Sequence, residues 1–348
     1  MTRKQINIAV LCGPENGSPR VLAETLNAFL LDEGHASEIN FRVKALTRLL
    51  PARMLNYNRW LTFFYKAYHY IGDRRMFSLM RKKDAVILCG CTPYAFYSDS
   101  YHVERFRKII KKPVLYYAVQ YLENAPTIVE RLKAGKHAGL ERYDWHLTVS
   151  PVTEVRHTPA PPWSRLGLYL KSTGLEPVAK EEFFAVVDFS HPGYEAYREE
   201  QISALKELGI PYISLEKRYT LAEIRELYKK AAVYFMQSTE AYGMPIAECL
   251  ACGSYIFTPD TSWPMSWRLD EHPEVHGPGT LPGCFVVYND PADLRKKLLE
   301  LRDNYDTEKT PREVFDIFHS YYPSFYEGDR ESLEELMGKI REGKLVRE

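Results

Sequence analysis

The sequence has no long apolar run, no excess of charge of either sign and no clear targeting segment. A helix needs roughly 20 apolar residues to cross a bilayer, and no run here approaches that length, so we predict no transmembrane helix. The segment Met1 to Gln5 is polar and the apolar run Ile6 to Leu11 is too short for a signal peptide, which leads us to expect a cytoplasmic protein. The 348 residues are 45% hydrophobic and 26% charged, a globular composition with room for two domains.

Cysteine is scarce, with six residues in the chain, and its spacing does not suit a metal ion. Cys249 and Cys252 form a C-x2-C pair inside a predicted helix, but no second pair with zinc spacing follows them. Most of the cysteines lie in or beside apolar segments, where a thiol packs as a small apolar side chain in a reducing compartment. We therefore predict no metal site.

The sequence also lacks a G-x-G-x-x-G dinucleotide fingerprint after its first predicted strand, residues 6–11. A short loop with two glycines follows, then an amphipathic helix over about residues 20–31 and a second strand over residues 39–43. This alternation predicts the opening of a doubly wound α/β domain.

The zero net charge hides an uneven distribution along the chain. Residues 1–170 contain 25 Lys and Arg against 14 Asp and Glu, whereas residues 171–348 contain 21 against 32. A positively charged first half favours an anionic partner.

Residues 42–83 are the most basic stretch, and aromatic side chains are interleaved with the charges. Aromatic and basic residues together favour contact of residues 54–83 with a membrane surface at the inner face of the membrane. They also suit a phosphate-bearing acceptor such as nucleic acid. An aromatic core face with a solvated basic back is the structural alternative.

The stretch with the most chemical information is residues 238–259, which follows a predicted buried strand. It begins with the helix-capping types Ser238 and Thr239, and Pro245 marks the start of a short helix that ends at Gly253. The free N–H groups at a helix N-terminus attract phosphates, and the preceding glycine would let a ligand approach the backbone.

Two carboxylates flank this predicted anion site, Glu240 in the loop and Glu248 about one turn into the helix. Carboxylates repel a bare phosphate, but they accept hydrogen bonds from hydroxyls. The arrangement therefore suits a ligand with phosphate in its middle and hydroxyls at both ends, such as a sugar nucleotide.

The same stretch resembles the E-x7-E region of the retaining glycosyltransferases with the GT-B fold, the family-4-like "glycosyl transferases group 1". The family pattern is S-x-x-E-x-[FY]-G-[LM]-P-x-x-E-[AC]-[ML]-A-x-G. The sequence matches it at Ser238, Glu240, Tyr242, Gly243, Met244, Pro245, Glu248, Cys249, Leu250, Ala251 and Gly253.

The resemblance implies an α/β fold of two Rossmann-like doubly wound domains that face each other across a cleft. The implied division is an acceptor domain over residues 1–165, a linker over residues 166–180, and a donor domain over residues 181–320. A helical tail over residues 321–348 would pack back on the first domain.

The resemblance also implies metal-independent, retaining transfer of a sugar from a nucleotide-sugar donor that serves as substrate, with no cofactor. Glu240 would lie at the sugar ring and Glu248 would hold the ribose hydroxyls. The diphosphate would be held by the motif backbone, with the donor-binding set Tyr242, Gly243, Met244, Pro245 and Ile246. The positive first half favours an acidic acceptor such as a lipid-linked glycan. The loop with Gly13 and Gly17 would lie in the cleft, although a plain turn explains these glycines equally well.

Two departures from the family pattern leave alternatives open. The family carries a Gly-Arg pair and a Lys after the strand at residues 183–189, where this chain has Ser190-His191-Pro192-Gly193-Tyr194. The candidates to replace that positive charge are His191, Arg198, Lys217 and Arg218. Where the family has a catalytic-site His, this chain has Gln120, which can bind a hydroxyl but cannot take a proton.

These departures favour a non-catalytic GT-B relative that acts as a binding or partner subunit. The intact motif with both glutamates favours the enzyme. A sugar-nucleotide epimerase is a third reading, but it would need further acid–base carboxylates in the first domain, which we do not find. A glycosyltransferase that acts on nucleic acid is also open.

Overall fold

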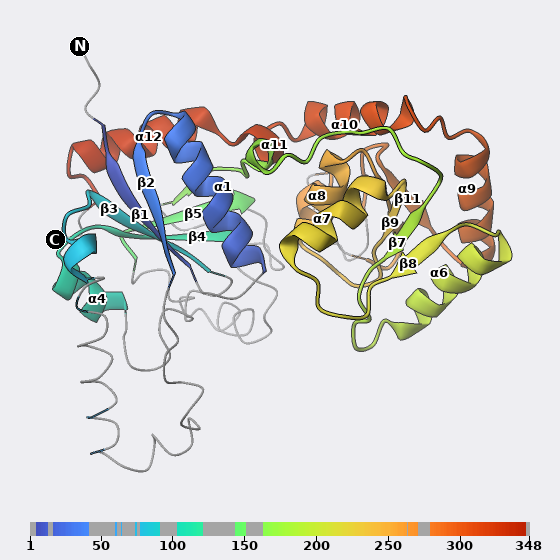
Figure 1. Ribbon diagram of the computed structural model, residues 1–348, viewed down its shortest axis with the longest axis horizontal. Helices are drawn as coiled ribbons and strands as arrows, with labels where there is room; N and C mark the ends of the chain where they lie inside the picture. Colours follow the sequence, from blue (N-terminus) through green and yellow to red (C-terminus); the bar gives the residue numbers. More distant parts are fainter. Residues whose placement is uncertain are drawn as a thin grey trace. The chain divides into compact units, whose positions relative to one another are not determined.

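A computed structural model describes residues 5–12, 17–41, 60, 64, 74, 77–90, 103–120, 143–150, 163–262, 264–270 and 279–345 (Figure 1). The chain divides into two compact units. The first comprises residues 1–149, 159–166 and 329–348, and the second comprises residues 150–158 and 167–328. Among the described residues, none of the helices combines the length and the apolar character that a membrane span requires.

The described part of the first unit contains a six-stranded sheet with the order β2-β1-β3-β4-β5-β6. Its strands are β1 (Asn7–Cys12), β2 (Ala36–Phe41), β3 (Ala85–Cys89), β4 (Val114–Gln120), β5 (Trp145–Ser150) and β6 (Trp163–Arg165). Strand β1 pairs in parallel with β2 and β3, as do β3 with β4 and β5 with β6. Helices of this unit are α1 (Ser18–Asp32), α4 (Val103–Ile110) and α12 (Arg330–Arg341).

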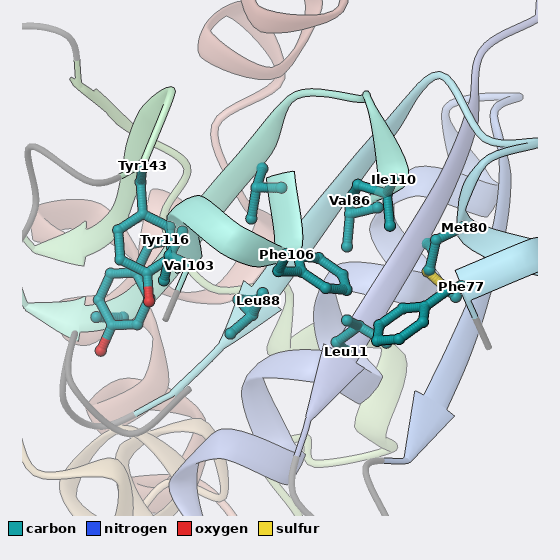
Figure 2. Close-up of a cluster of buried hydrophobic side chains, with 13 residues drawn as sticks. Leu11, Phe77, Met80, Val86, Leu88, Val103, Phe106, Ile110, Tyr116 and Tyr143 are labelled. Carbon is teal, nitrogen blue, oxygen red and sulfur yellow. The ribbon is translucent and has the colours of Figure 1, made fainter. Parts of the chain in front are cut away.

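The core of the first unit forms where α4 and the helical residues 77–80 cover one face of the sheet. Figure 2 shows the rings of Phe77 and Phe106 beside Leu11 and Leu88 of the strands. The two ring centroids lie 5.8 Å apart, and all four side chains are buried. Full burial of such a side chain contributes roughly 1.5–3 kcal/mol, which explains why these strands are nearly continuous apolar runs in the sequence.

The C-terminal helix α12 belongs to the first unit and packs there through a buried apolar face. Leu333, Leu336 and Met337 are fully buried. At its start, Arg330 pairs with Glu33 just after α1 at 2.9 Å, and near its end Lys339 lies 5.4 Å from the ring centre of Trp145.

The second unit contains a five-stranded sheet with the order β11-β10-β9-β7-β8, and every pair in it is parallel. The strands are β7 (Ala185–Val187), β8 (Tyr212–Ser214), β9 (Val233–Phe235), β10 (Tyr255–Pro259) and β11 (Phe285–Tyr288). The helices are α6 (Glu195–Glu207), α7 (Leu221–Lys230), α8 (Met244–Ala251), α9 (Pro291–Asp303), α10 (Thr310–Tyr321) and α11 (Ser324–Glu327), with the 3₁₀ turns η2 (Leu170–Thr173) and η3 (Met265–Trp267). The turn η2 falls within the segment predicted as a linker.

The strand order of the second unit fixes where a ligand would bind. The chain runs from β7 outward to β8 and then returns to β9 on the opposite side of β7. In an open parallel sheet, such a switch point leaves a crevice at the carboxyl ends of the two central strands. The segments that begin at residues 188 and 236 follow β7 and β9, and therefore lie at this point.

Two details of the second unit concern the starts of its helices. Helix α6 begins at Glu195, shortly after Gly193, which adopts a positive φ of 89°. Ser238 and Thr239 do not cap a helix: the N-cap of α8 is Gly243, with no side-chain cap. Thr220 caps α7 as predicted, in a reciprocal capping box with Glu223.

Candidate functional site

The loops after β7 and β9 are tied to each other at the switch point. The two strands are direct neighbours, with Val187 opposite Phe235. Beyond them, the backbone N–H of Asp188 donates to the carbonyl of Phe235 at 3.2 Å, and the Nε2 of Gln237 donates to the carbonyl of Asp188 at 3.0 Å. Gln237 is fully buried. The position of the loop that carries Glu240 is thus fixed relative to the end of β7.

Three titratable side chains meet at this edge: Asp188, His191 and Glu240. The Nε2 of His191 lies 3.4 Å from Oδ2 of Asp188. The hydrogen bond with Asp188 is the main cause that raises the pKa of His191, and the charges of Asp188 and Glu240 also raise it while burial opposes them. Burial raises the pKa of Glu240 to about 7, the negative charge of Asp188 adds to the rise, and His191 opposes it. A carboxyl group that titrates near neutral pH is typical of functional sites.

The N-terminus of α8 lies directly after this cluster in the chain. The helix is eight residues long with Pro245 in its first turn, where the missing N–H costs no hydrogen bond. Among the described residues, none accepts a hydrogen bond from the backbone N–H of Gly243 or Met244. These donors and the positive end of the helix dipole make the loop suitable for an anion.

The structure gives a different reason for glycine at position 243 than ligand access. Gly243 has a φ of +69°, which is strained for other residues. A Cβ there would lie 2.7 Å from Cδ1 of Ile246, so that space is occupied by the protein itself. The backbone geometry of the turn, and the packing of Ile246 against it, both require glycine.

Glu248 is buried and paired with an arginine. Its Oε1 accepts a hydrogen bond from Nε of Arg225 on α7 at 2.9 Å and forms an ion pair with Nη2 of the same arginine at 2.8 Å. Burial raises the pKa of Glu248, and the charge and hydrogen bonding of Arg225 act in the opposite direction. Among the described residues none donates a hydrogen bond to Oε2 of Glu248, so that oxygen can accept one from a ligand.

Arg225 and Asp188 are site residues that the sequence reasoning missed. Arg225 lies on the same helical face as Leu221 and Tyr228. A cationic residue on the apolar face of a predicted helix could have identified it as a partner of a buried acid. Asp188 follows β7 directly. Because the strand was predicted to continue to residue 189, Asp188 was assigned to the strand and not to the loop after it. An acidic residue at the carboxyl end of a central strand was the corresponding signal.

The predicted donor-binding cations occupy different environments. Arg198 does not lie on a solvated helix face, because its Nε donates to the carbonyl of Asp188 at 3.1 Å and its Nη2 bonds Ser214. It therefore holds the ends of β7 and β8 together. Lys217 and Arg218 are both exposed in the loop after β8. The ammonium of Lys217 lies 5.4 Å from the ring centre of Tyr219.

The remaining candidates belong to the first unit. Gly13 and the side chain of Gln120 lie outside the described residues. Gly17 is the N-cap of α1, its carbonyl accepts from Arg20 and Val21, and a Cβ there would meet only Pro19, at 3.9 Å. Its observed role is that of a turn residue. Within the described part of the chain, no group of three or more His, Cys, Asp or Glu side chains is placed to hold a metal ion.

Comparison with known proteins identifies the fold. No protein-family model matches the sequence, and no curated protein matches it. The chain is similar to the catalytic domain of starch synthase IV from Arabidopsis thaliana bound to ADP and acarbose, with a TM-score of 0.58, 11% identity, and coverage of 99% of this chain and 100% of that chain. Two weaker likenesses are to Anabaena HepE in complex with UDP and glucose (TM-score 0.49, 12% identity, 90% and 95% covered) and to Phytolacca americana UGT2 complexed with UDP-2fluoro-glucose and pterostilbene (0.49, 11%, 98% and 100%). The two parallel-sheet α/β units are those of the GT-B fold.

Proposed function

We propose that the protein is a glycosyltransferase that binds a nucleotide-sugar donor at the carboxyl edge of its second sheet. The observation that carries the proposal is the pair Glu240 and Glu248, largely or fully buried carboxyl groups that precede and follow the N-terminus of α8 in the chain. An anion site between two carboxylates suits a diphosphate with a sugar at one end and a nucleoside at the other. Starch synthase IV, which has the same fold, binds ADP, and this supports the nucleotide part of the proposal.

Each part of the donor has a proposed contact in this geometry. The N–H groups of Gly243 and Met244 bind the diphosphate, and the positive end of α8 stabilises its charge. Oε2 of Glu248 accepts a hydrogen bond from a ribose hydroxyl, while Arg225 binds the other carboxylate oxygen and opposes the rise in pKa that burial causes. The half-buried ring of Tyr219, in the loop after β8, lies beside Phe189 and offers a face to the base.

The proposed chemistry is transfer with retention, and it needs charge stabilisation at two points. The leaving diphosphate gains negative charge, which oriented N–H groups and the helix dipole stabilise without any reorganisation. At the other end, the ionised Glu240 accepts a hydrogen bond from a sugar hydroxyl and stabilises positive charge at the reacting carbon. His191, which pairs with Asp188, opposes the rise in the pKa of this carboxylate and so favours its ionised form. No step in this scheme requires a metal ion.

A thermal-shift panel of nucleoside diphosphates and nucleotide sugars tests the proposal. A ligand at about 100 times its Kd stabilises the native state by about 2.7 kcal/mol, which shifts Tm by several degrees. We expect one base and one sugar to stand out, and the shift to disappear in the Glu248→Ala variant. A flat panel, or a shift that the variant retains, would contradict the proposal and favour a non-catalytic GT-B subunit.

We further propose that the protein is cytoplasmic, that its acceptor is acidic and membrane-associated, and that residues 54–83 contact the inner face of the membrane. Trp60 and Phe64 both have helical backbone and are 73% and 64% exposed. They are four residues apart in the chain. Exposed aromatic side chains within a basic segment are suited to the interface of an anionic bilayer.

Vesicle sedimentation tests this membrane contact. We expect the protein to sediment with vesicles that contain anionic lipid, less with neutral vesicles, and far less after Trp60→Ser with Phe64→Ser. Tyr321→Ser is the matched control, because Tyr321 is also a large exposed side chain, at 54%, but belongs to the second unit. Equal sedimentation of both variants would count against the segment as the contact.

A further inference from the structure

The loop between β9 and α8 leads to the backbone N–H groups of Gly243 and Met244, which have no acceptor among the described residues. This loop packs against the buried Trp267, which comes later in the chain. Trp267 in η3 has no exposed surface. Its ring stacks on Tyr242 with centroids 5.3 Å apart, and rings from the C-terminal helices surround it at 5–6 Å, namely Phe318, Tyr322 and Phe325. The described part of the segment after β10 therefore packs against the loop between β9 and α8.

Ser266 and Trp267 donate hydrogen bonds to two successive carbonyl groups of the loop between β9 and α8. The backbone N–H of Ser266 donates to the carbonyl of Ala241 at 2.7 Å. The indole Nε1–H of Trp267 donates to the carbonyl of Tyr242. Both bonds come from the same side, the side of η3.

Because the peptide bond is planar, these contacts also determine the direction in which the following backbone N–H points. In a trans peptide the C=O of one residue and the N–H of the next point in opposite directions. Because the carbonyl of Tyr242 points at the indole, the N–H of Gly243 points away from η3. That N–H is one of the two without an acceptor among the described residues.

We propose that Trp267 is a positioning residue of the donor site, which aims the N–H of Gly243 at the diphosphate by holding the carbonyl of Tyr242. The inference rests on the proposed function for the identity of the ligand. The packing of the ring would serve the fold in any case, so the indole N–H is the group to test.

The test compares variants that differ in this one donor, with inorganic pyrophosphate as the probe of the anion site. Replacement of Trp267 by β-(3-benzothienyl)alanine keeps the shape of the ring and exchanges the N–H for sulfur. Trp267→Phe is a second, genetically simple variant. Tyr322→Phe is the matched control, because its hydroxyl donates to the backbone carbonyl of Trp267 and its loss removes one hydrogen bond from the same cluster.

We expect the benzothienyl variant to raise the Kd for pyrophosphate about fivefold to tenfold, the factor that follows from the net contribution of one hydrogen bond. Tyr322→Phe should change the Kd for pyrophosphate less than twofold, although its Tm should fall about as much as that of the benzothienyl variant. Unchanged affinity in the benzothienyl variant, or no pyrophosphate binding to the wild-type protein, would overturn the inference. The protein could bind pyrophosphate in a way that depends on Trp267 and yet bind no nucleotide sugar. That result would refute the proposed function but would support this inference.

Discussion

Glu240→Gln is expected to reduce turnover of the donor by about 100-fold and to change donor affinity less than threefold, since one lost electrostatic contact to the transition state has an effect of that order. Glutamine keeps the size of the side chain and its carbonyl acceptor, but it cannot carry the negative charge that stabilises the reacting carbon. The measurement is the rate of transfer or hydrolysis with the nucleotide sugar found in the thermal-shift panel, together with its Kd.

The control for this variant is another carboxylate on the same edge of the sheet. Glu216 lies in the loop after β8, its side chain is 74% exposed, and it pairs weakly with Arg198 at 3.6 Å. Glu216→Gln should leave turnover within about twofold of the wild type, because exposed ion pairs contribute little. If Glu240→Gln and Glu216→Gln lose equal activity, Glu240 has no special role.

The pH dependence of turnover gives the same prediction a second measurement. Because burial raises the pKa of Glu240 to about 7, the carboxyl is protonated at pH 6 and ionised at pH 8. Turnover should therefore rise with pH through about 7 in the wild type, and this rise should be absent in Glu240→Gln.

Stability should show the opposite trend. The native state binds the Glu240 proton more tightly than the unfolded chain does, so stability falls as pH rises from the ordinary carboxyl pKa to the raised one. Glu240→Gln should be more stable than the wild type at pH 8, and this difference in stability should be smaller at pH 5. A residue that costs stability and increases activity is the expected sign of a functional site.

The sequence predicted the elements whose signal is local. Strands such as β3 and β11 are short apolar runs, and α7 has a clear 3.6-residue pattern together with its capping box. The motif around Glu240 and Glu248 was also local, since it lies within one loop and one helix. The sequence therefore predicted the GT-B fold and the motif residues of the proposed site.

The contacts that give those residues their properties could not be predicted in this way. Arg225 is 23 residues from Glu248 in the chain, and Trp267 is 25 residues from the carbonyl it binds. Both pairs form only after helices and strands have packed, and neither leaves a fixed spacing in the sequence. The same holds for Arg198, which the sequence suggested as a donor contact and which instead bonds the ends of two strands.

The two glutamates of the motif differ in how their charge is compensated, and this difference leads to the second large expected effect. Two nitrogens of Arg225 contact Oε1 of Glu248, whereas the charges near Glu240 among the described residues are His191, which opposes the rise in its pKa, and Asp188, which adds to it. Arg225→Met would leave a buried carboxylate without a partner, which costs about 3 kcal/mol in comparable cases. We expect that loss in the free energy of unfolding, measured by denaturant titration at pH 7.

Arg225→Met should also weaken donor binding by at least tenfold at pH 7, because the unpaired Glu248 will take up a proton and become a poorer acceptor for the ribose hydroxyl. Donor affinity should then recover as pH rises, while Arg225→Lys should keep most of it at all pH values. Adding Glu248→Gln to Arg225→Met should restore much of the stability, since no charge is left buried, and none of the affinity.

A matched buried pair in the first unit separates stability from binding in this experiment. Asp144 accepts from Arg107 and from the backbone N–H of Val114, and its side chain is 2% exposed. Arg107→Met should also lower the free energy of unfolding, because it removes the charged partner of a buried carboxylate, yet donor affinity should stay within about twofold of the wild type. If both variants weaken the donor equally, the loss reflects general destabilisation, and Glu248 is a structural rather than a ribose-binding carboxylate.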